Sequence, residues 1–492
     1  MRTLQDPRRN LAEQIALHAR QRPTKAAIVQ GGQVMDFRAL DLAVRQRAAH
    51  LIDLGVEPGR IVGVALSDSI EHIVALFAVA RAGGVILPMD CRWKEFEKQR
   101  VALHFEPAVV LVEPGAAFDG ARCIEVCPSW ETQSALCNPD RDFPDGERGL
   151  IMSLSSGTTG RPKGPMVSHH KFFSRFWTHW VDLGFGSRET YINATPLYFG
   201  GGRSFSMSTL FAGGTVVLYP PPYEPDELAG ELARTGATVL FLVPTLLRRL
   251  LGCDASTLAP MRQLKTLVSS GSALTALERV QIRDLICPNF IEFYSSTEGG
   301  GISVLSPDDQ LRYGESVGRP VFGVEVQIVD DTHKALPAGQ VGRIRYRGPA
   351  VADGFYRDPE ASLEAFRDGW FYPGDLGNFN EEGFLFLKGR AKDMIIRGGI
   401  NIYPLEVETT LLNHEHVADA SVVGWPSREF DEEVAAFVML KGDVAPEALI
   451  ALCKSRLASY KVPRQIFVVE QLPRNSLGKV VKSELVSRLP PL

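Results

Sequence analysis

The chain has 492 residues, with 53 basic and 58 acidic side chains and a formal net charge of −5. Charged residues make up 23% and apolar residues 45% of it, which is ordinary globular composition and excludes long disordered tracts. The slight acidity argues against nucleic acid as a partner, and the length predicts about three structural units.

Cysteine usage and hydropathy bear on the compartment. The seven cysteines contain no CxxC pair and no HExxH motif occurs, so neither a disulfide framework nor a structural zinc site is expected. The N-terminal residues lack the apolar core of a secretory signal, and the longest apolar stretch, residues 73–80, is too short to span a membrane. We therefore predict a cytoplasmic protein with no membrane span.

Strand and helix patterns alternate along most of the chain. Ser69 is expected to cap a helix whose apolar face includes Ile70, Ile73 and Phe77, and Gly83 to end it. A further helix is predicted at 226–235. Short apolar runs predict buried strands at 85–87, 109–112, 215–219, 238–243, 265–268 and 291–294. This alternation indicates α/β layers with largely parallel sheets.

The pattern changes near residue 390, where a stretch rich in glycine gives way to a smaller α+β unit. We predict strands at 420–423, 434–440 and 465–469, and helices at 446–459 and 480–488. The predicted division is an N-terminal domain at 1–389, a hinge at 390–393 and a C-terminal domain at 394–492.

Residues 155–164 read SSGTTGRPKG and follow an apolar run. Glycines allow tight turns, hydroxyls add donors beside exposed backbone N–H groups, and Lys163 adds a positive charge, which together suit a polyphosphate. The Walker A spacing is absent, and an ordinary glycine-rich loop remains the alternative.

This segment resembles the phosphate loop of the ANL superfamily of adenylate-forming enzymes, which includes acyl- and aryl-CoA synthetases, peptide-synthetase adenylation domains and luciferases. Similar segments follow in order from about Asn10 to Lys482. The resemblance implies a large multi-subdomain N-terminal domain, a small mobile C-terminal domain, and ATP, Mg²⁺ and coenzyme A as cofactors. It assigns to the nucleotide Ser155, Ser156, Gly157, Thr158, Thr159, Gly160 and Lys163, with Thr158 also near the metal.

Residues 294–298, YSSTE, follow a predicted strand and resemble a second family motif. The resemblance implies that Tyr294 stacks on adenine, Thr297 approaches the α-phosphate and Glu298 holds Mg²⁺, and it places Ser295 and Ser296 at the nucleotide. Ser295 stands where the family usually has glycine. Without the family, Glu298 is an ordinary loop carboxylate.

Upstream, the Gly271, Ser272 and Ala273 segment resembles the family's adenine-edge loop. A plain strand-to-helix turn is the alternative.

Residues 370–375, WFYPGD, resemble the segment whose aspartate binds both ribose hydroxyls, which assigns that role to Asp375. Pro373 replaces the usual threonine. Residues 389–408 resemble the family's hinge, with Arg390 near the ribose and Lys392 as the pivot. Gly398 and Gly399 are implied to border the pantetheine arm of CoA, as in the CoA-ligase branch, although the residues alone also fit a β-hairpin with a glycine turn.

Residues 473–479, PRNSLGK, resemble the family's terminal motif and make Lys479 the expected catalytic cation. A carboxylate would attack the α-phosphorus of ATP to give acyl-AMP and pyrophosphate, and the CoA thiol would then release AMP. The groups expected to act are Lys479, Glu298, Thr297 and Lys163. Rotation about Lys392 would exchange Lys479 for the glycine pair between the two steps.

The resemblance implies an acyl pocket lined by the segments 195–202, 243–249 and 294–303, called the acyl segments here. They contain the glycine triplets 200–202 and 299–301. If both triplets line the pocket it is roomy, which favours an aryl, alicyclic or medium-chain acid; flexible turns are the alternative. Arg203, Arg248 or Arg249 could bind a second carboxylate, against outward-facing helix arginines. The residues assigned to the pocket are Phe199, Gly200, Gly201, Val243, Gly299 and Gly300.

Two other functions stay open. The acceptor could be a carrier-protein phosphopantetheine instead of CoA, or the chain could be a non-catalytic nucleotide-binding regulator, against which the intact Lys163, Glu298, Asp375 and Lys479 argue. A homodimer is compatible with the sequence, which does not fix the oligomeric state or the identity of the acid.

Overall fold

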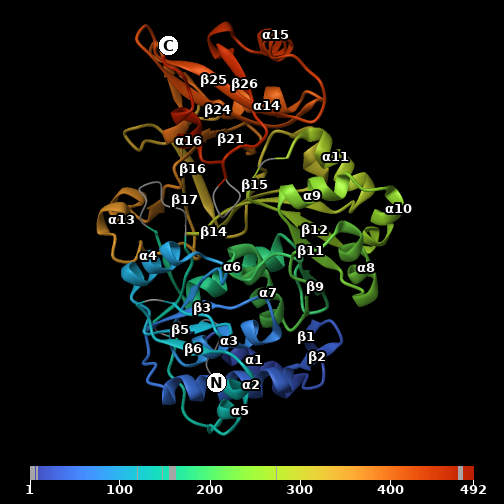
Figure 1. Cartoon of the computed structure of the whole chain (residues 1–492), viewed down its shortest axis with the longest axis vertical. Helices are drawn as coiled ribbons and strands as arrows, with labels where there is room; N and C mark the ends of the chain where they lie inside the picture. Colours follow the sequence, from blue (N-terminus) through green and yellow to red (C-terminus); the bar gives the residue numbers. More distant parts are fainter. Residues whose placement is uncertain are drawn as a thin grey trace.

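The computed structural model describes residues 6, 9–118, 120–146, 148–154, 162–272, 274–474 and 480–492. In Figure 1, the N-terminal residues, drawn blue to green, fill the lower and middle parts, and β24 (Val417–Ser427), β25 (Asp431–Leu440), α14 (Pro404–Leu412) and α15 (Pro446–Arg456) form the top. The predicted site residues at 155–160, 273 and 479 lie outside the described residues.

The first sheet has the order β6-β5-β3-β4-β7-β8 and is parallel except between β7 and β8. Ser69 caps α3, accepting a hydrogen bond from His72 N at 3.1 Å, as predicted. The strands are β3 (Ile61–Ala65), β4 (Val85–Pro88), β5 (Val109–Val112), β6 (Cys123–Glu125), β7 (Gly149–Met152) and β8 (Met166–Ser168). The helices in this part of the chain are α1 (Glu13–Gln21), α2 (Phe37–Asp53), α3 (Ile70–Arg81), α4 (Glu95–Phe105) and α5 (Pro128–Ala135).

The second sheet has the order β15-β14-β13-β12-β11-β9-β10-β1-β2, with a parallel centre from β13 to β1. Its strands are β1 (Ala26–Gln30), β2 (Gln33–Asp36), β9 (Thr190–Asn193), β10 (Thr215–Leu218), β11 (Val239–Leu242), β12 (Thr266–Ser269), β13 (Phe290–Ser296), β14 (Gly300–Leu305) and β15 (Arg319–Pro320). The accompanying helices are α6 (His169–Val181), α7 (Gly200–Ala212), α8 (Pro225–Thr235), α9 (Pro244–Leu251), α10 (Ala255–Leu258), η1 (Ala259–Gln263), α11 (Ala276–Leu285) and α12 (Pro307–Arg312).

Helix α3 lies between these two sheets, since it contacts β3 and β4 of the first and β1 of the second. A helix covered on both sides needs apolar residues all round, which explains the unbroken apolar run at 73–80. The main core joins this helix to residues of both sheets. In the part of the chain that the structure describes, no helix combines the length and hydropathy needed to cross a membrane.

A third sheet, β18-β19-β17-β20-β21 with β16 on β17, is antiparallel throughout. The prediction of largely parallel sheets therefore fits the first two sheets and not this one, whose strands lie in the glycine-rich stretch before residue 390. The elements are β16 (Glu325–Val329), β17 (Gly342–Arg347), α13 (Pro359–Ala365), β18 (Phe366–Arg367), β19 (Trp370–Phe371), β20 (Asp375–Phe379) and β21 (Leu385–Arg390).

The C-terminal part has its own sheet, β23-β22-β25-β24 with β26 on β25, and its own apolar core. Helix α14 contacts β21 where this part meets the third sheet. The elements are η2 (Ala391–Asp393), β22 (Ile395–Arg397), β23 (Ile400–Ile402), α14 (Pro404–Leu412), β24 (Val417–Ser427), β25 (Asp431–Leu440), α15 (Pro446–Arg456), η3 (Ser459–Lys461), β26 (Gln465–Val468) and α16 (Lys482–Ser487). The predicted hinge at 390–393 coincides with η2 in sequence, and its motion stays a prediction.

Candidate active site

The second sheet brings two of the motif segments to one edge. Strands β12 and β13 are parallel neighbours, so the segments that follow them leave the sheet at the same edge. Gly271 follows β12 with φ +108°, a conformation that favours glycine, and Ser272 beside it is exposed. The hydroxyls of Ser270 and Ser295 lie 3.3 Å apart across this edge. The segment is thus placed beside Ser295, and its role at the adenine edge stays a prediction.

Tyr294, Asp375 and Arg390 meet at the junction of the second and third sheets. The Tyr294 hydroxyl donates a hydrogen bond to Asp375 Oδ2, and Arg390 Nε lies 2.8 Å from Asp375 Oδ1. Asp375 and Arg390 are opposite each other in the β20–β21 pair, so strand register fixes this contact. Burial, and then the nearby Asp375, raise the pKa of Tyr294, which stays a neutral phenol.

Glu298 is held through its main chain. The carbonyl oxygens of Thr297 and Glu298 each accept a hydrogen bond from Arg175 Nη2 at 3.1 Å, and Ala352 N donates to the Glu298 carbonyl at 2.9 Å. The Glu298 side chain is half-buried, and its carboxylate makes no hydrogen bond or ion pair with any residue that the structure describes. Such a carboxylate is available to a hard cation such as Mg²⁺.

The loop after β13 is tight. Ser296 Oγ lies 2.6 Å from the Tyr346 hydroxyl and accepts a hydrogen bond from Gly299 N at 3.0 Å. A Cβ at Gly299 would stand 2.3 Å from the same hydroxyl of Tyr346, which is fully buried. Only glycine therefore fits at this position without movement of the tyrosine.

The glycine triplets do not leave empty space of the kind expected for a roomy pocket. A Cβ at Gly201 would meet the ring of Phe241 at 2.5 Å, and one at Gly301 would meet the ring of Phe293 at 2.7 Å. Only Gly200 in these triplets has nothing within 4 Å. At five of the six glycines a side-chain or main-chain atom thus lies within 3.1 Å of where a Cβ would stand, so the triplets open little space, and their place in the acyl pocket stays a prediction.

Phe199 and Val243 begin the helices on either side of these rings. Phe199 precedes α7 and its ring centroid lies 4.5 Å from that of Tyr198, while Val243 precedes α9. The Thr195 hydroxyl donates to the Phe241 carbonyl at 3.5 Å, joining the two segments. The structure therefore places the 195–202 segment beside the end of β11, the strand that leads into the 243–249 segment.

The three arginines considered for a second carboxylate are all engaged. Arg248 lies 2.6 Å from Glu278 and Arg249 lies 3.1 Å from Glu224, both on the outer helices. Arg203 is 1% exposed and donates to main-chain carbonyls, as described below. The structure gives none of them as an available partner for a diacid.

Lys163 is half-buried, with its Nζ 5.2 Å from the centre of the Phe355 ring. The next residues are fixed to the same segment, since Tyr356 N donates to the Gly164 carbonyl at 2.9 Å and Pro165 bridges Phe355. The C-terminal end of the phosphate segment is thus anchored, while Ser155 to Gly160 lie outside the described residues.

Gly398 and Gly399 form the turn of the β22–β23 hairpin, with φ values of +55° and +80°. Both values require the left-handed region, so the hairpin reading of this sequence is confirmed, and contact with CoA stays a prediction. Lys392 is exposed in η2. Lys479 lies outside the described residues, between the bridged pair Arg474 and Val480.

Residues 15–356 match the AMP-binding enzyme family, and residues 406–479 match the C-terminal domain of AMP-binding enzymes.

The chain belongs to the AMP-binding enzyme family.

Individual relatives agree over nearly the whole length. The 2-succinylbenzoate–CoA ligase of Bacillus licheniformis is 30% identical, covering 94% of this chain and 97% of that protein. The feruloyl-CoA synthase of an Amycolatopsis species is 31% identical, covering 96% and 97%. The o-succinylbenzoate CoA synthetase of Bacillus subtilis, solved with its acyl-adenylate intermediate, superposes with a TM-score of 0.88 at 26% identity, covering 97% and 98%. The chain is therefore an AMP-forming acid:CoA ligase, which activates a carboxylic acid as acyl-AMP and forms acyl-CoA.

Sequence reasoning missed two residues of the site in this family member, Arg175 and Tyr346. Both are buried and lie far from the motifs in sequence, yet both contact the segment 296–299. For Arg175 the available signal was its place on the buried face of α6 beside Phe172 and Phe176, since an arginine is seldom buried without a purpose.

Proposed function

We propose that this ligase activates an aryl carboxylic acid, with its nucleotide bound between the YSSTE segment and the third sheet. The observation that supports this place for the nucleotide is the contact of Tyr294 and Arg390 with Asp375. These residues come from two sheets, and their contact leaves a phenol, a carboxylate and a guanidinium at the edge where β12 and β13 end. The aromatic ring suits a purine, and the carboxylate suits a pair of ribose hydroxyls.

Mg²⁺ fits the half-buried carboxylate of Glu298, which has no hydrogen bond or ion pair to a described residue. No cluster of three or more ligand side chains occurs in the described chain, so phosphate oxygens would complete the coordination. When bound, the ion supplies positive charge beside the phosphates. Thr297 is proposed to contact the α-phosphate and Lys163 the distal phosphates.

The acid carboxylate and ATP are both anions, so the first half-reaction needs positioned cations. We assign to Lys479 the delivery of an ammonium between the two, and to the residues around Lys392 the turning of the C-terminal part. The hairpin turn at Gly398 and Gly399 would then face the pantetheine arm of CoA in the second half-reaction.

The aryl assignment is supported by the rings that fill the acyl segments. Phe205 contacts Phe241 and Phe293 with ring centroids 4.9 and 6.3 Å apart, and both partners are slightly exposed at 5% and 7%. Aromatic side chains around a substrate favour an acid with a flat ring, because edge-to-face and offset-stacked contacts stabilise pairs of rings. Two relatives named above act on 2-succinylbenzoate and ferulate by name.

All seven cysteines are free thiols, which suits a reducing cytoplasm.

The test is acid-dependent exchange of pyrophosphate into ATP over a panel of benzoates, cinnamates, alicyclic acids and fatty acids, followed by CoA-dependent AMP release. We expect exchange with at least one aryl acid at a kcat/KM about 10-fold or more above every fatty acid. Exchange confined to fatty acids contradicts the aryl assignment. Absence of exchange with every acid contradicts the placement of the catalytic groups.

A further inference from the structure

Two buried arginines on neighbouring helices have no carboxylate partner among the described residues. Arg175 of α6 is 8% exposed and Arg203 of α7 is 1% exposed. The buried arginines Arg47 and Arg279, in contrast, are ion-paired, Arg47 with Glu71 at 2.9 Å and Arg279 with Glu292. Burial lowers the pKa of Arg175 to about 10 and of Arg203 to about 9, so both remain charged at neutral pH. Burying a cation without an ion pair costs folding free energy. A buried arginine is therefore expected where its charged hydrogen bonds serve a role that a neutral side chain could not serve.

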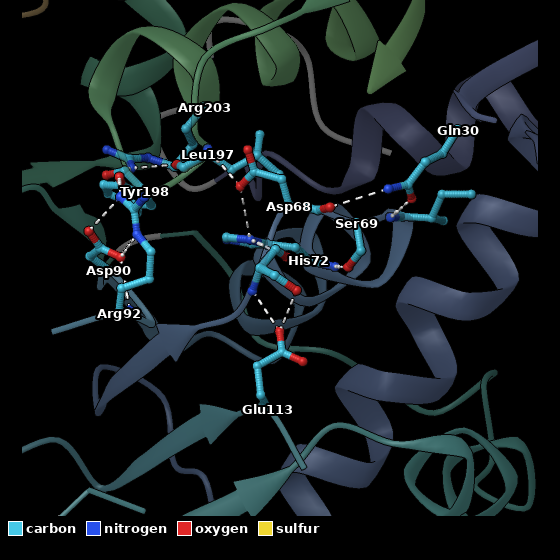
Figure 2. Close-up of polar contacts among 12 residues, drawn as sticks. Gln30, Asp68, Ser69, His72, Asp90, Arg92, Glu113, Leu197, Tyr198 and Arg203 are labelled. Carbon is cyan, nitrogen blue, oxygen red and sulfur yellow. Dashed lines mark hydrogen bonds and ion pairs between the residues drawn. The ribbon is translucent and has the colours of Figure 1, made fainter. Parts of the chain in front are cut away.

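Arg203 binds the main chain just before Phe199. Its Nη1 donates to the carbonyls of Leu197 at 3.0 Å and Tyr198 at 2.9 Å (Figure 2). Its Nη2 donates to Ser153 Oγ at 2.7 Å. On the other side of this segment, Leu197 N donates to Asp68 Oδ1 at 2.9 Å. Ser153 directly follows β7, the strand that leads toward the phosphate segment. Arg203 therefore ties the acyl segment to the strand before the phosphate segment.

Arg175 makes the corresponding contacts on the nucleotide side. Its Nη2 donates to the carbonyls of Thr297 and Glu298, both at 3.1 Å. Its aliphatic part covers Gly300, where a Cβ would stand 3.1 Å from Arg175 Cγ. The backbone of Glu298 is thus fixed, while its carboxylate makes no hydrogen bond or ion pair with a described residue and acts on Arg175 only through its charge.

A guanidinium suits this task because its donors are fixed in one plane and can reach two carbonyls at once. Hydrogen bonds from a charged donor are also stronger than those from an amide. Both helices thereby hold irregular backbone in one geometry next to the expected substrates. We propose that Arg175 and Arg203 are positioning residues, Arg175 for the segment that carries Glu298 and Arg203 for the segment that carries Phe199. The proposal rests on the proposed roles of those two segments.

The first readout is hydrogen exchange, which needs no catalysis. In Arg175→Lys and Arg175→Met, amide exchange over residues 294–302 is expected to rise about 10-fold or more, with residues 195–203 unchanged. In Arg203→Lys and Arg203→Met the pattern is expected to reverse. Arg47→Lys, a buried arginine in an ion pair distant from both segments, is the matched control and should change neither. Where a methionine variant fails to fold, the lysine variant decides.

The second readout is functional. The Arg175 variants should raise the Mg²⁺ concentration for half-maximal ATP binding, measured by calorimetry, by about 10-fold, as loss of a supporting contact does at metal sites. The Arg203 variants should raise the KM for the acid by about 10-fold and leave the Mg²⁺ dependence within about twofold. Equal changes at both segments, or none, overturn the proposal. Wild-type protein that shows this Mg²⁺-dependent ATP binding but no acid-dependent pyrophosphate exchange contradicts the proposed function alone. The roles of the two arginines are still tested in that case by amide hydrogen exchange and by ATP binding.

Discussion

Around the nucleotide segments polar side chains contact one another, whereas around the acyl segments aromatic rings occupy the space beside glycines. On the first side, Asp375 joins Tyr294 and Arg390 by direct hydrogen bonds. On the second, the rings of Phe241 and Phe293 fill the positions where Gly201 and Gly301 lack a Cβ. Tyr294, Phe241 and Phe293 all lie on strands of the second sheet, whereas Asp375 and Arg390 lie on strands of the third, so the polar contacts form where the two sheets meet.

This difference predicts that substitutions on the two sides affect activity and stability in different proportions. A polar group that touches only ligand costs activity when removed and leaves stability nearly unchanged. A ring packed against glycine contributes to the core, so its change alters both stability and the shape offered to the acid. Variants on the two sides should therefore fail in different assays.

The largest effect is expected from Lys479→Ala on the nucleotide side. Loss of the ammonium should lower adenylate formation by about 10³-fold, because the two anions then meet without that charge. Thioester formation from presynthesised acyl-AMP and CoA should remain, measured as AMP release. Lys454→Ala, an exposed lysine of α15, is the control and should affect neither step. Equal loss of both half-reactions would count against the assigned role.

Glu298→Gln should lower pyrophosphate exchange by about 10²-fold and raise the Mg²⁺ requirement. The unfolding midpoint should stay unchanged, since the carboxylate makes no hydrogen bond or ion pair within the described chain. Glu364→Gln, at an exposed position on α13, serves as the control. A drop in stability equal to the drop in rate would show that Glu298 supports the fold instead.

The two sides also differ in how far the sequence predicts them. Tyr294, Asp375 and Arg390 were assigned to one ligand from local motifs, and the structure places all three in contact. Their roles at ATP stay predictions. The acyl side depends on rings such as Phe241 that come from other elements, and no local pattern shows which ring faces which glycine.

The fold divides in the same way. The six strands predicted in the first two sheets follow from apolar runs, and Ser69 caps α3 as predicted, with strand boundaries that agree within two residues. The antiparallel third sheet was not predicted, because its short strands alternate with glycine turns and its pairings join distant segments. Arg175 was missed for the same reason, since its partners lie more than 100 residues away, with a separation of 122 to Thr297.

On the acyl side, Gly201→Ala should destabilise the protein by about 1–3 kcal/mol, because the new Cβ would stand 2.5 Å from the Phe241 ring. Helix propensity alone predicts the opposite sign in the first turn of α7. The double variant Gly201→Ala/Phe241→Leu should recover most of the loss, and Phe241→Leu alone should shift preference about 10-fold toward bulkier aryl acids. The measurements are urea unfolding and kcat/KM over the acid panel; additive effects of the two changes would contradict the packing described here.

The smallest effect on activity is expected from Asp68→Asn, which lies behind the acyl segment and should change stability instead (Figure 2). Burial raises the pKa of Asp68 to about 6, and its side chain is 4% exposed. The folded state therefore holds this proton more tightly than the unfolded state, so ionisation of Asp68 lowers wild-type stability progressively from about pH 4 to pH 6. The amide can still accept from Leu197 N, and the variant should be more stable than wild type by about 1–3 kcal/mol at pH 7.5, with the difference narrowing as the pH falls from about 6 to about 4. His72 Nδ1 lies 3.8 Å from Asp68 Oδ1, but burial lowers the pKa of His72 to about 4, so this neighbour is neutral in the folded protein above about pH 5. Exposed Asp140→Asn should show no such gap in urea unfolding, and a gap independent of pH would mean that the charge of Asp68 is not its cause.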